Sequence, residues 1–487
     1  MGSTLNYDDS DVLDVLIIGA GISGINAAYR LHDELPDKKY LILEGRDNLG
    51  GTWDLFRYPG IRSDSDLHTF GYAFKEWTGP DIAEGKEIIS YLKAVSDENG
   101  ITDRTRYSTK VNSAAYSSEE RCWFVNATSG GQEKQYRSRF LYSCTGYYDY
   151  HAALKADIPG IDNFKGKVVH PQFWNITEDD YRGKRVAVIG SGATAITLLP
   201  SMADVAKDVT IVQRSPAYIL SLDKFDPIAK FFRMFLPKRL AAFAIRQKNV
   251  ARMYGSYHLF QTFPGFAKRV LRFATKLQLP KDVPLDPHFK PNYNPWDQRL
   301  CICPDGDFYK CLRDGKAHIA TGHIEQVTGN EIIMKNGERI PADIIVTATG
   351  LKLQIGGGVD MSVDKKPIKA NDCFVWKGSM LEGVPNFAIS IGYTNASWTL
   401  GSDCTAQFVC RLIKHLDQYH KSQVQPKPEN RNQLQEAPLL NLNSTYVKKA
   451  ENDLPKAATS GPWRMRTNYW YDLVQAKYGS FDQLAFA

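Results

Sequence analysis

The sequence predicts an α/β fold with two Rossmann-like dinucleotide-binding domains, the second inserted in the first, together with a helical insert. Two glycine-rich turns, each behind a short apolar run, predict the two domains. Two further apolar runs mark the points where the chain passes from one domain to the other. A chain of 487 residues, 43% of them apolar, can form two or three globular domains with ordinary cores.

The first glycine-rich turn follows the apolar run Val12–Ile18 and has the pattern G-x-G-x-x-G. Such glycines permit a tight turn, let the backbone approach a pyrophosphate, and let helix and strand pack closely. The next run ends in Glu44, whose carboxylate is placed to accept hydrogen bonds from a ribose diol. This half therefore predicts an FAD-like dinucleotide, whose expected contacts in the turn are Gly19, Gly21, Ser23 and Gly24.

The second glycine-rich turn follows Arg185–Ile189 and is succeeded by an apolar run at 209–212. That run leads to Arg214 and Ser215, and an arginine in this place suits a 2′-phosphate. The second half therefore predicts NADPH. Its expected contacts in the turn are Gly190, Ser191, Gly192, Ala193, Thr194 and Ala195. For both turns the alternative is a glycine-rich turn in an α/β core without a ligand.

Two Thr-Gly pairs, at 145–146 and 349–350, each end an apolar run and predict crossings between the domains. Between the first glycine-rich turn and the first crossing, we expect a hairpin whose two strands are residues 107–111 and 123–128. The NADP domain is thus inserted in the FAD domain. The expected ranges are 1–150 and 351–487 for the FAD domain, 151–216 and 298–350 for the NADP domain, and 217–297 for the helical insert.

The formal net charge of +6 is unevenly distributed, because residues 227–281 contain twelve Lys or Arg and no Asp or Glu. This stretch is also rich in Phe and Leu, which predicts basic amphipathic helices interrupted at Pro237 and Pro264. It could attract an anionic cofactor or make peripheral contact with an anionic membrane surface. The alternative is a solvated insert whose apolar face packs on the core. No motif supports nucleic-acid binding.

Other global features predict a cytoplasmic protein. No stretch approaches the roughly 20 apolar residues of a membrane span, and the N-terminal segment is too polar for a secretory signal. The eight cysteines are thinly spread and are expected to be free buried thiols, without a metal site.

Several residues outside the turns are candidates for contact with the cofactors. Small residues after Glu44 would let the backbone lie against a flavin, and the run at 57–66 combines a Pro-Gly turn with two Arg and two Asp. The alternative for that run is a surface turn held by ion pairs. His170 lies in the link between the domains, where hydrogen bonds to the backbone would couple their motions. The other expected contacts are Gly51, Thr52, Trp53, Arg62, Ser63, Asp64 and Val111.

The link also carries the pattern F-x-G-x-x-x-H-x-x-x-W from Phe164 to Trp174. This pattern, before the second turn, resembles the fingerprint of type I Baeyer–Villiger monooxygenases in the flavin-containing monooxygenase superfamily. The stretches 54–60, 293–299 and 392–398 look closest to its ethionamide-activating branch. The similarity runs from about Val12 to about Tyr471.

The resemblance implies residue roles and a reaction. Arg299 would be the active-site arginine beside the flavin, Asp64 its carboxylate partner, and Trp398 a further contact near the cofactor and substrate. The enzyme would use NADPH and O2 to convert a small-molecule ketone into an ester or lactone through a C4a-peroxyflavin, with sulfide or thioamide oxidation as a side activity. Many members place Lys before the arginine, whereas this chain has Gln298, which leaves Arg214 as the main selector for NADPH.

Two other functions remain open at this point. An enzyme that mainly oxidises sulfur or nitrogen would share the cofactors but act on thioethers or amines. A protein of another class, a catalytically idle NADP sensor, would bind both nucleotides without consuming oxygen.

Overall fold

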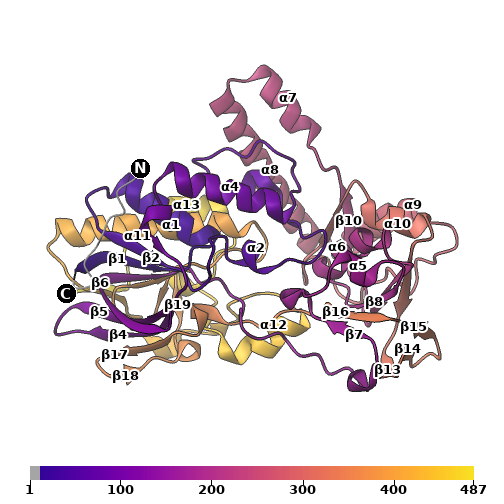
Figure 1. Cartoon of the computed structure of the whole chain (residues 1–487). Helices are drawn as coiled ribbons and strands as arrows, with labels where there is room; N and C mark the ends of the chain where they lie inside the picture. Colours follow the sequence, from indigo (N-terminus) through magenta and orange to yellow (C-terminus); the bar gives the residue numbers. More distant parts are fainter. Residues whose placement is uncertain (1–10) are drawn as a thin grey trace.

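The computed structural model describes residues 11–487, so the polar N-terminal segment before Asp11 lies outside it. Two sheets form the centres of two α/β units, with the first sheet on the left and the second on the right of Figure 1. The fold class predicted from the sequence is confirmed.

The first sheet has nine strands, in the order β18-β17-β4-β5-β6-β1-β2-β3, and β21 also pairs with β6. Its parallel centre aligns Val15 with Tyr40 on one side and with Phe140 on the other. The strands are β1 (Val12–Ile18), β2 (Tyr40–Leu43), β3 (Thr105–Arg106), β4 (Thr109–Ser117), β5 (Cys122–Ser129), β6 (Gln132–Ser143), β17 (Asp360–Val363), β18 (Lys366–Pro367) and β21 (Phe387–Ile389). Both the N-terminal and the C-terminal parts of the chain therefore build this sheet.

Helices cover one face of the first sheet, where α1 packs against α11 and α11 against α13 (Figure 1). Every residue of β2 is buried, as expected of a parallel strand covered on both faces. The helices of this unit are α1 (Ile22–Glu34), α2 (Thr52–Leu55), α3 (Leu67–Phe70), α4 (Gly85–Glu98), α11 (Trp398–Gln418), α12 (Thr445–Ala450) and α13 (Tyr469–Tyr478).

The second sheet has five parallel strands in the order β12-β9-β8-β16-β7. They are β7 (Lys167–Val169), β8 (Arg185–Ile189), β9 (Asp208–Gln213), β12 (Ala317–Thr321) and β16 (Ile344–Thr347). Around them lie α5 (Glu178–Tyr181), α6 (Ala193–Ala203), α10 (Asp307–Arg313), the pair β10 (Ile219–Leu222) and β11 (Cys301–Pro304), and the antiparallel β13 (Ile324–Val327), β14 (Glu331–Met334) and β15 (Arg339–Pro341).

Two chain segments connect the units, and they run side by side in opposite directions. Tyr148 and Leu353 form an antiparallel bridge, and the Asp149 N–H donates to the Lys352 carbonyl (2.8 Å). The Lys352 ammonium also donates to the Asp149 carboxylate (2.8 Å), whose pKa is lowered because this hydrogen bond and two backbone N–H groups outweigh the effect of burial. The covalent connection between the units is therefore a single pair of neighbouring segments.

Three helices between β10 and β11 form the basic insert: α7 (Pro227–Phe235), α8 (Lys238–Thr262) and α9 (Pro264–Gln278). Pro237 precedes α8 and Pro264 begins α9, so the expected interruptions are confirmed. At the top of Figure 1, α7 stands out from the body of the protein.

Some details differ from the expectations. The first hairpin strand was expected at 107–111, but β4 begins later and continues to Ser117, because its pairing with β5 extends to the turn at 118–121. All eight cysteines are free and buried, as expected. No helix within residues 11–487 has both the length and the apolar character of a membrane span.

Candidate functional site

The first glycine-rich turn allows no larger residue at two of its glycines. A Cβ on Gly24 would lie 1.8 Å from the Gly19 carbonyl oxygen, and a Cβ on Gly19 would lie 2.8 Å from the Cys144 carbonyl oxygen. Gly19 also has a φ of +100°, which other residues rarely adopt. Helix α1 therefore packs directly on the end of β1, and its first N–H groups point out of the sheet edge.

The backbone of Gly51 lies against the same turn. A Cβ on Gly51 would be 3.1 Å from the Gly21 Cα, and the Gly50 N–H donates to the Ala20 carbonyl (2.9 Å). Two glycine backbones thus face each other at the N-terminal ends of α1 and α2. This arrangement fits a bound pyrophosphate, because backbone N–H groups can approach it without side chains in between.

Glu44 lies at the end of β2, where a ribose would be bound. Its carboxylate accepts from the N–H groups of Ala20 (2.6 Å) and Arg46 (2.9 Å). Burial raises the pKa of Glu44, and these two N–H groups offset only part of that effect. Each carboxylate oxygen has a further lone pair, so the group can still accept hydrogen bonds from a diol. The geometry fits the role that the sequence predicts for Glu44.

The other flavin-side candidates form a polar and aromatic surround. The Thr52 hydroxyl is hydrogen-bonded to the Tyr150 hydroxyl (3.1 Å), and Trp53 packs edge-on against Phe70. Val111 lies in β4 with its side chain in the apolar core of the first unit, so any contact with a cofactor would come from its backbone.

Trp398 connects the first turn to the middle of the protein. Its indole N–H donates to the Ser23 hydroxyl (3.2 Å), and its ring stacks on Tyr147 with a centroid distance of 4.5 Å. Gly392 makes this position possible, because a Cβ there would lie 2.3 Å from the indole ring. Two predicted site residues, Ser23 and Trp398, are thus in direct contact.

The run at 57–66 lies between the two units. A Cβ on Gly60, whose φ is +72°, would meet the Ser201 hydroxyl of α6 at 1.8 Å. Arg62 donates to the Asp307 carboxylate of α10 (2.5 Å), so this arginine joins the units. Ser63 is buried, and its hydroxyl donates to the Ser65 carbonyl (2.7 Å). The run is therefore an interface segment rather than a free surface turn.

The second glycine-rich turn has the same form as the first. A Cβ on Gly190 would lie 2.2 Å from the Ala348 carbonyl oxygen, and the fully buried Ala195 packs α6 on the sheet. In contrast, no atom lies within 4 Å of a Cβ built on Gly192. The space in front of Ala193 and the α6 N-terminus is therefore open, as a pyrophosphate requires.

The residues after β9 are placed for a 2′-phosphate. Arg214 is exposed, and its guanidinium donates to the Thr445 hydroxyl of α12 (3.1 Å). The Ser191 hydroxyl donates to the Ser215 carbonyl (2.7 Å), which joins the turn to this strand end. Thr194 hydrogen-bonds the Tyr58 hydroxyl of the interface run, and burial raises the pKa of Tyr58 to about 12. These residues fit an NADPH site.

A cavity of about 290 Å³ contains both predicted catalytic residues. Asp64 Oδ1 lies 4.0 Å from Arg299 Nη1, and each side chain is about one-third exposed (31% and 33%). The apolar part of the lining comes from three regions: Ile82 of the first unit, Leu220, Leu222, Leu300 and Ile302 around β10 and β11, and Met253 and Phe260 of α8. Charged groups also line the cavity, namely Arg252 and the aspartates Asp66, Asp81, Asp223 and Asp226.

Arg299 lies between the two glycine-rich turns. On one side it faces Tyr147, the ring that stacks on Trp398. On the other side Cys301, two residues further along, contacts the Ser191 carbonyl through its thiol (3.9 Å). Burial opposes the charge of Arg299, but Tyr147 and Asp64 outweigh it and raise the pKa, so the guanidinium stays charged.

His170 caps the short helical turn Pro171–Phe173 of the link. Its Nδ1 accepts from the Gln172 backbone N–H (3.2 Å), and burial lowers its pKa. The Gln172 side chain in turn donates to the Asp149 carbonyl (2.6 Å), in one of the two connecting segments. His170 is thus joined through one residue to the connection between the units.

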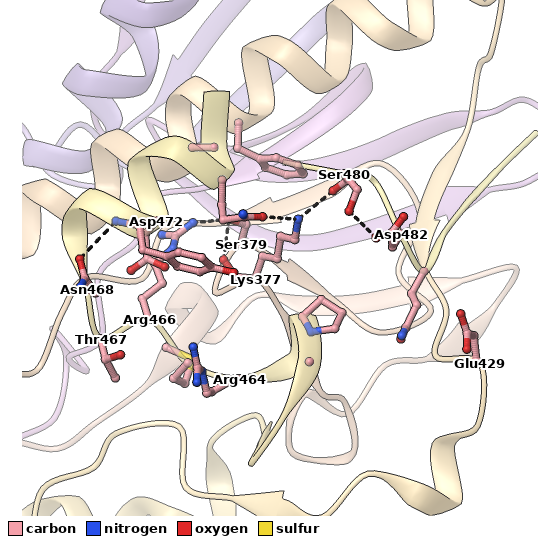
Figure 2. A pocket seen from close by; sticks show the side chains of 18 of the residues that line it. Lys377, Ser379, Glu429, Arg464, Arg466, Thr467, Asn468, Asp472, Ser480 and Asp482 are labelled. Carbon is pink, nitrogen blue, oxygen red and sulfur yellow. Dashed lines mark hydrogen bonds between the residues drawn. The ribbon is translucent and has the colours of Figure 1, made fainter. Parts of the chain in front are cut away.

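A second cavity, of about 600 Å³, is lined by none of the predicted site residues. Figure 2 shows its polar walls, which include the basic residues Lys377, Arg464 and Arg466 and the acidic residues Glu429, Asp472 and Asp482. It lies among α11, α13 and the C-terminal segment. We place the functional site in the smaller cavity, because only that cavity contains the Asp64–Arg299 pair.

Sequence reasoning missed three aromatic residues of the site. Tyr150 lies on the Gly51 turn, and the Tyr393 carbonyl accepts from Arg299 (3.5 Å). Trp296 lines the cavity with a φ of +74°, which is rare for a bulky residue and typical of functional sites. Trp296 and Tyr393 lie in the stretches 293–299 and 392–398, whose resemblance to the ethionamide-activating branch was the signal that could have identified them.

Comparison with known proteins places this site in a family. The flavin-binding monooxygenase-like family matches residues 13–254. The FAD-containing monooxygenase EthA of Mycolicibacterium smegmatis is 43% identical over 473 residues, which are 96% of each chain. The probable FAD-binding monooxygenase AlmA of Acinetobacter baylyi is 42% identical and covers 96% of this chain and 95% of its own.

Solved structures share the fold over the whole chain. A complex of OTEMO with FAD and NADP has a TM-score of 0.73 at 20% identity and covers 98% of this chain and 99% of its own. Steroid monooxygenase bound to NADP has a TM-score of 0.75 at 21% identity, with the same coverage. The resemblance to flavin-containing monooxygenases is confirmed at the level of the family, and the relatives named above are FAD-containing or FAD-binding enzymes, as the first turn predicts. The chain therefore belongs to the flavin-binding monooxygenase-like family and is a flavin-dependent monooxygenase.

Proposed function

We propose that this enzyme uses NADPH and O2 to convert ketones into esters or lactones. The observation that carries the proposal is the charged Arg299 beside Asp64 in an apolar cavity, between the two dinucleotide turns. The pattern between Phe164 and Trp174 supports the same reaction class.

The cofactor sites would be divided between the units. The first turn with Glu44, Gly51 and Thr52 would hold FAD, and the second turn with Arg214 would hold NADPH. Bound FAD, once reduced by NADPH, would activate O2 so that one oxygen atom enters the substrate and the other leaves as water. The protein contributes binding, orientation and electrostatics to this chemistry.

Arg299 would supply a fixed positive charge where oxygen atoms gain negative charge. Its contacts to Asp64 (4.0 Å) and to the Tyr393 carbonyl (3.5 Å) are both long, so most of its five N–H donors remain available. A guanidinium at neutral pH does not release its proton, and it therefore stabilises an anion without protonating it. Asp64 would orient Arg299 and balance part of its charge.

The apolar lining would strengthen this interaction. Charges interact more strongly where less water surrounds them, and Leu300, Ile302 and Leu220 give apolar surface to the cavity that contains Arg299, where a bound substrate would displace water. The same exclusion would limit loss of activated oxygen to bulk water. The lining thus favours oxygen transfer to a carbonyl substrate over wasteful oxidation of NADPH.

The test compares Arg299→Ala and Arg299→Lys with Arg182→Ala, which removes the exposed ion pairs of Arg182 with Glu178 and Asp179 and changes no residue that lines the cavity. Each purified enzyme receives NADPH with one cyclic ketone or one thioether, and products are identified by mass spectrometry. We expect the Ala variant to retain NADPH oxidation but to lose at least about 100-fold in ester formation. The Lys variant should keep part of it, and Arg182→Ala should match the wild type.

Two results would contradict the proposed function. Normal ester formation by Arg299→Ala would remove the assigned role of Arg299. Thioether oxidation by the wild type without any ester would replace the proposed reaction by sulfur oxidation.

A further inference from the structure

The helical insert exposes an unusual amount of apolar surface. Of the twenty large apolar side chains that are exposed within residues 11–487, fourteen lie between Phe225 and Leu277. Eight of them surround α7 and the start of α8, a region that we call the insert tip (residues 225–243). These eight are Phe225, Ile228, Phe231, Met234, Phe235, Leu236, Leu240 and Phe243.

The apolar residues of the insert tip form faces rather than isolated points. Ile228, Phe231 and Phe235 follow helical spacing on α7 and are 50%, 56% and 64% exposed. On α8, Leu240 and Phe243 are three positions apart, hence on one side of the helix, and are 56% and 64% exposed. Contiguous apolar surface of this kind on a soluble protein marks an interaction site.

Unpaired positive charge accompanies this surface. Lys230, Lys238 and Arg239 are exposed and have no hydrogen-bond or ion-pair partner among the described residues. The acidic residue of the tip, Asp226, is paired with Lys248. The unpaired charged side chains of the insert tip are therefore all positive, and a negatively charged partner would be attracted to them.

The tip is also placed to reach a large flat partner. In Figure 1, α7 stands out beyond the rest of the protein, so an extended surface could contact it without meeting other elements first. Amphipathic helices with exposed Phe, Leu and Met next to Lys and Arg are typical of segments that lie in the surface of an anionic bilayer.

We propose that the insert tip docks on an anionic lipid bilayer. The apolar faces of α7 and the start of α8 enter the boundary between head groups and acyl chains, and Lys230, Lys238 and Arg239 contact lipid phosphates. A second copy of the chain fits less well, because a two-fold contact through this surface would bring the same cations together.

Docking would also bring the cavity wall to the lipid. Asp226 and Pro227 at the start of α7, and Met253 and Phe260 further along α8, line the cavity that contains Arg299. The two helices that would contact the bilayer are therefore the helices that close one side of the site.

The test measures co-sedimentation of the flavin-loaded enzyme with vesicles. One set contains phosphatidylglycerol and phosphatidylcholine in equal parts, and the other contains phosphatidylcholine alone. We expect binding to the anionic set, weakened in about 1 M NaCl because salt screens charges. Each cation near an anionic surface increases binding roughly fivefold, so K230E/K238E/R239E should bind at least about 100-fold less.

Two further variants separate the apolar part from general surface charge. F231S/F235S should lower binding by roughly 100-fold at unchanged net charge. K155E/K207E/K366E reverses three exposed lysines outside the insert and should bind almost as well as the wild type. All changed side chains are exposed, so flavin content and melting temperature serve as the folding check.

Three results would overturn the proposal. These are equal binding of the wild type and K230E/K238E/R239E, equal binding to both vesicle sets, or a dimer in solution that F231S/F235S dissociates. The last result would assign the tip to a second copy of this chain.

Discussion

A methyl group added at Gly24 should displace α1 from the first sheet. The new Cβ would lie 1.8 Å from the Gly19 carbonyl oxygen, and Gly19 is itself fixed against Cys144. An ordinary contact requires roughly 1.5 Å more, and a backbone oxygen cannot rotate away as a side chain can. Overpacking of this kind costs about 3 kcal/mol, the upper part of the usual range. For a domain of this size, that lowers the melting temperature by about 6 °C or more.

Gly192→Ala is the matched control in the second turn. Its φ is −83° and no atom lies within 4 Å of the added Cβ, but Gly192 is the N-cap of α6 and alanine is a poorer N-cap, so the melting temperature should fall by only about 1–3 °C. However, the same Cβ would stand in the open space that a pyrophosphate needs, so the KM for NADPH should rise. The two substitutions thus separate packing from binding.

The assay is thermal unfolding of both variants together with flavin content from absorbance. Gly24→Ala should melt about 6 °C or more below the wild type and lose flavin, whereas Gly192→Ala should melt within about 3 °C of the wild type with full flavin. The reasoning fails if Gly24→Ala melts like the wild type with full flavin, or if both variants melt equally early.

Three further predictions concern charge. Arg214→Ala should reduce the preference for NADPH over NADH by about tenfold or more, because a charge-assisted contact to the 2′-phosphate is lost; unchanged kcat/KM ratios for the two nucleotides would contradict this. Arg185 lowers the pKa of Asp343 to about 2, so this pair stabilises the fold above the unfolded pKa of about 4 and loses its effect as the pH falls from about 4 to about 2. Asp343→Asn should therefore flatten the acid dependence of urea unfolding in that window, and an equally steep dependence would exclude the pair. Asp149→Ala removes the Lys352 contact between the connecting segments, so more hydrogen peroxide should be released per NADPH than in the wild type; equal release would show that this contact does not affect coupling.

Local patterns were sufficient to predict the framework of the fold. Neighbouring residues predict the two glycine-rich turns and the strands in front of them, because turn, strand and helix signals act over short distances. They also predict where β2 and β9 end. The interruptions at Pro237 and Pro264 were predictable for the same reason, since proline cannot continue a helix from the preceding turn.

The remaining parts of the site depend on contacts between distant residues. Thr52 and Tyr150 are 98 positions apart, and Arg62 and Asp307 are 245 apart. No local pattern pairs such residues, so Arg62 was expected at the cofactor while its partner in α10 was not foreseen. Likewise the composition showed that the insert is basic, but tertiary packing determines which faces of its helices stay exposed to solvent.

The paired connecting segments also show that the second unit is a single insertion in the chain of the first. Because the Asp149 N–H and the Lys352 carbonyl are hydrogen-bonded neighbours, the chain leaves and re-enters the first unit at one point. Every strand of the nine-stranded sheet lies before or after this insertion, so a short loop in its place would leave the strand register of that sheet intact. The same loop would uncover part of the first unit's core, because Val250 of α8 packs in that core and Arg246 donates to the His68 and Gly71 carbonyls.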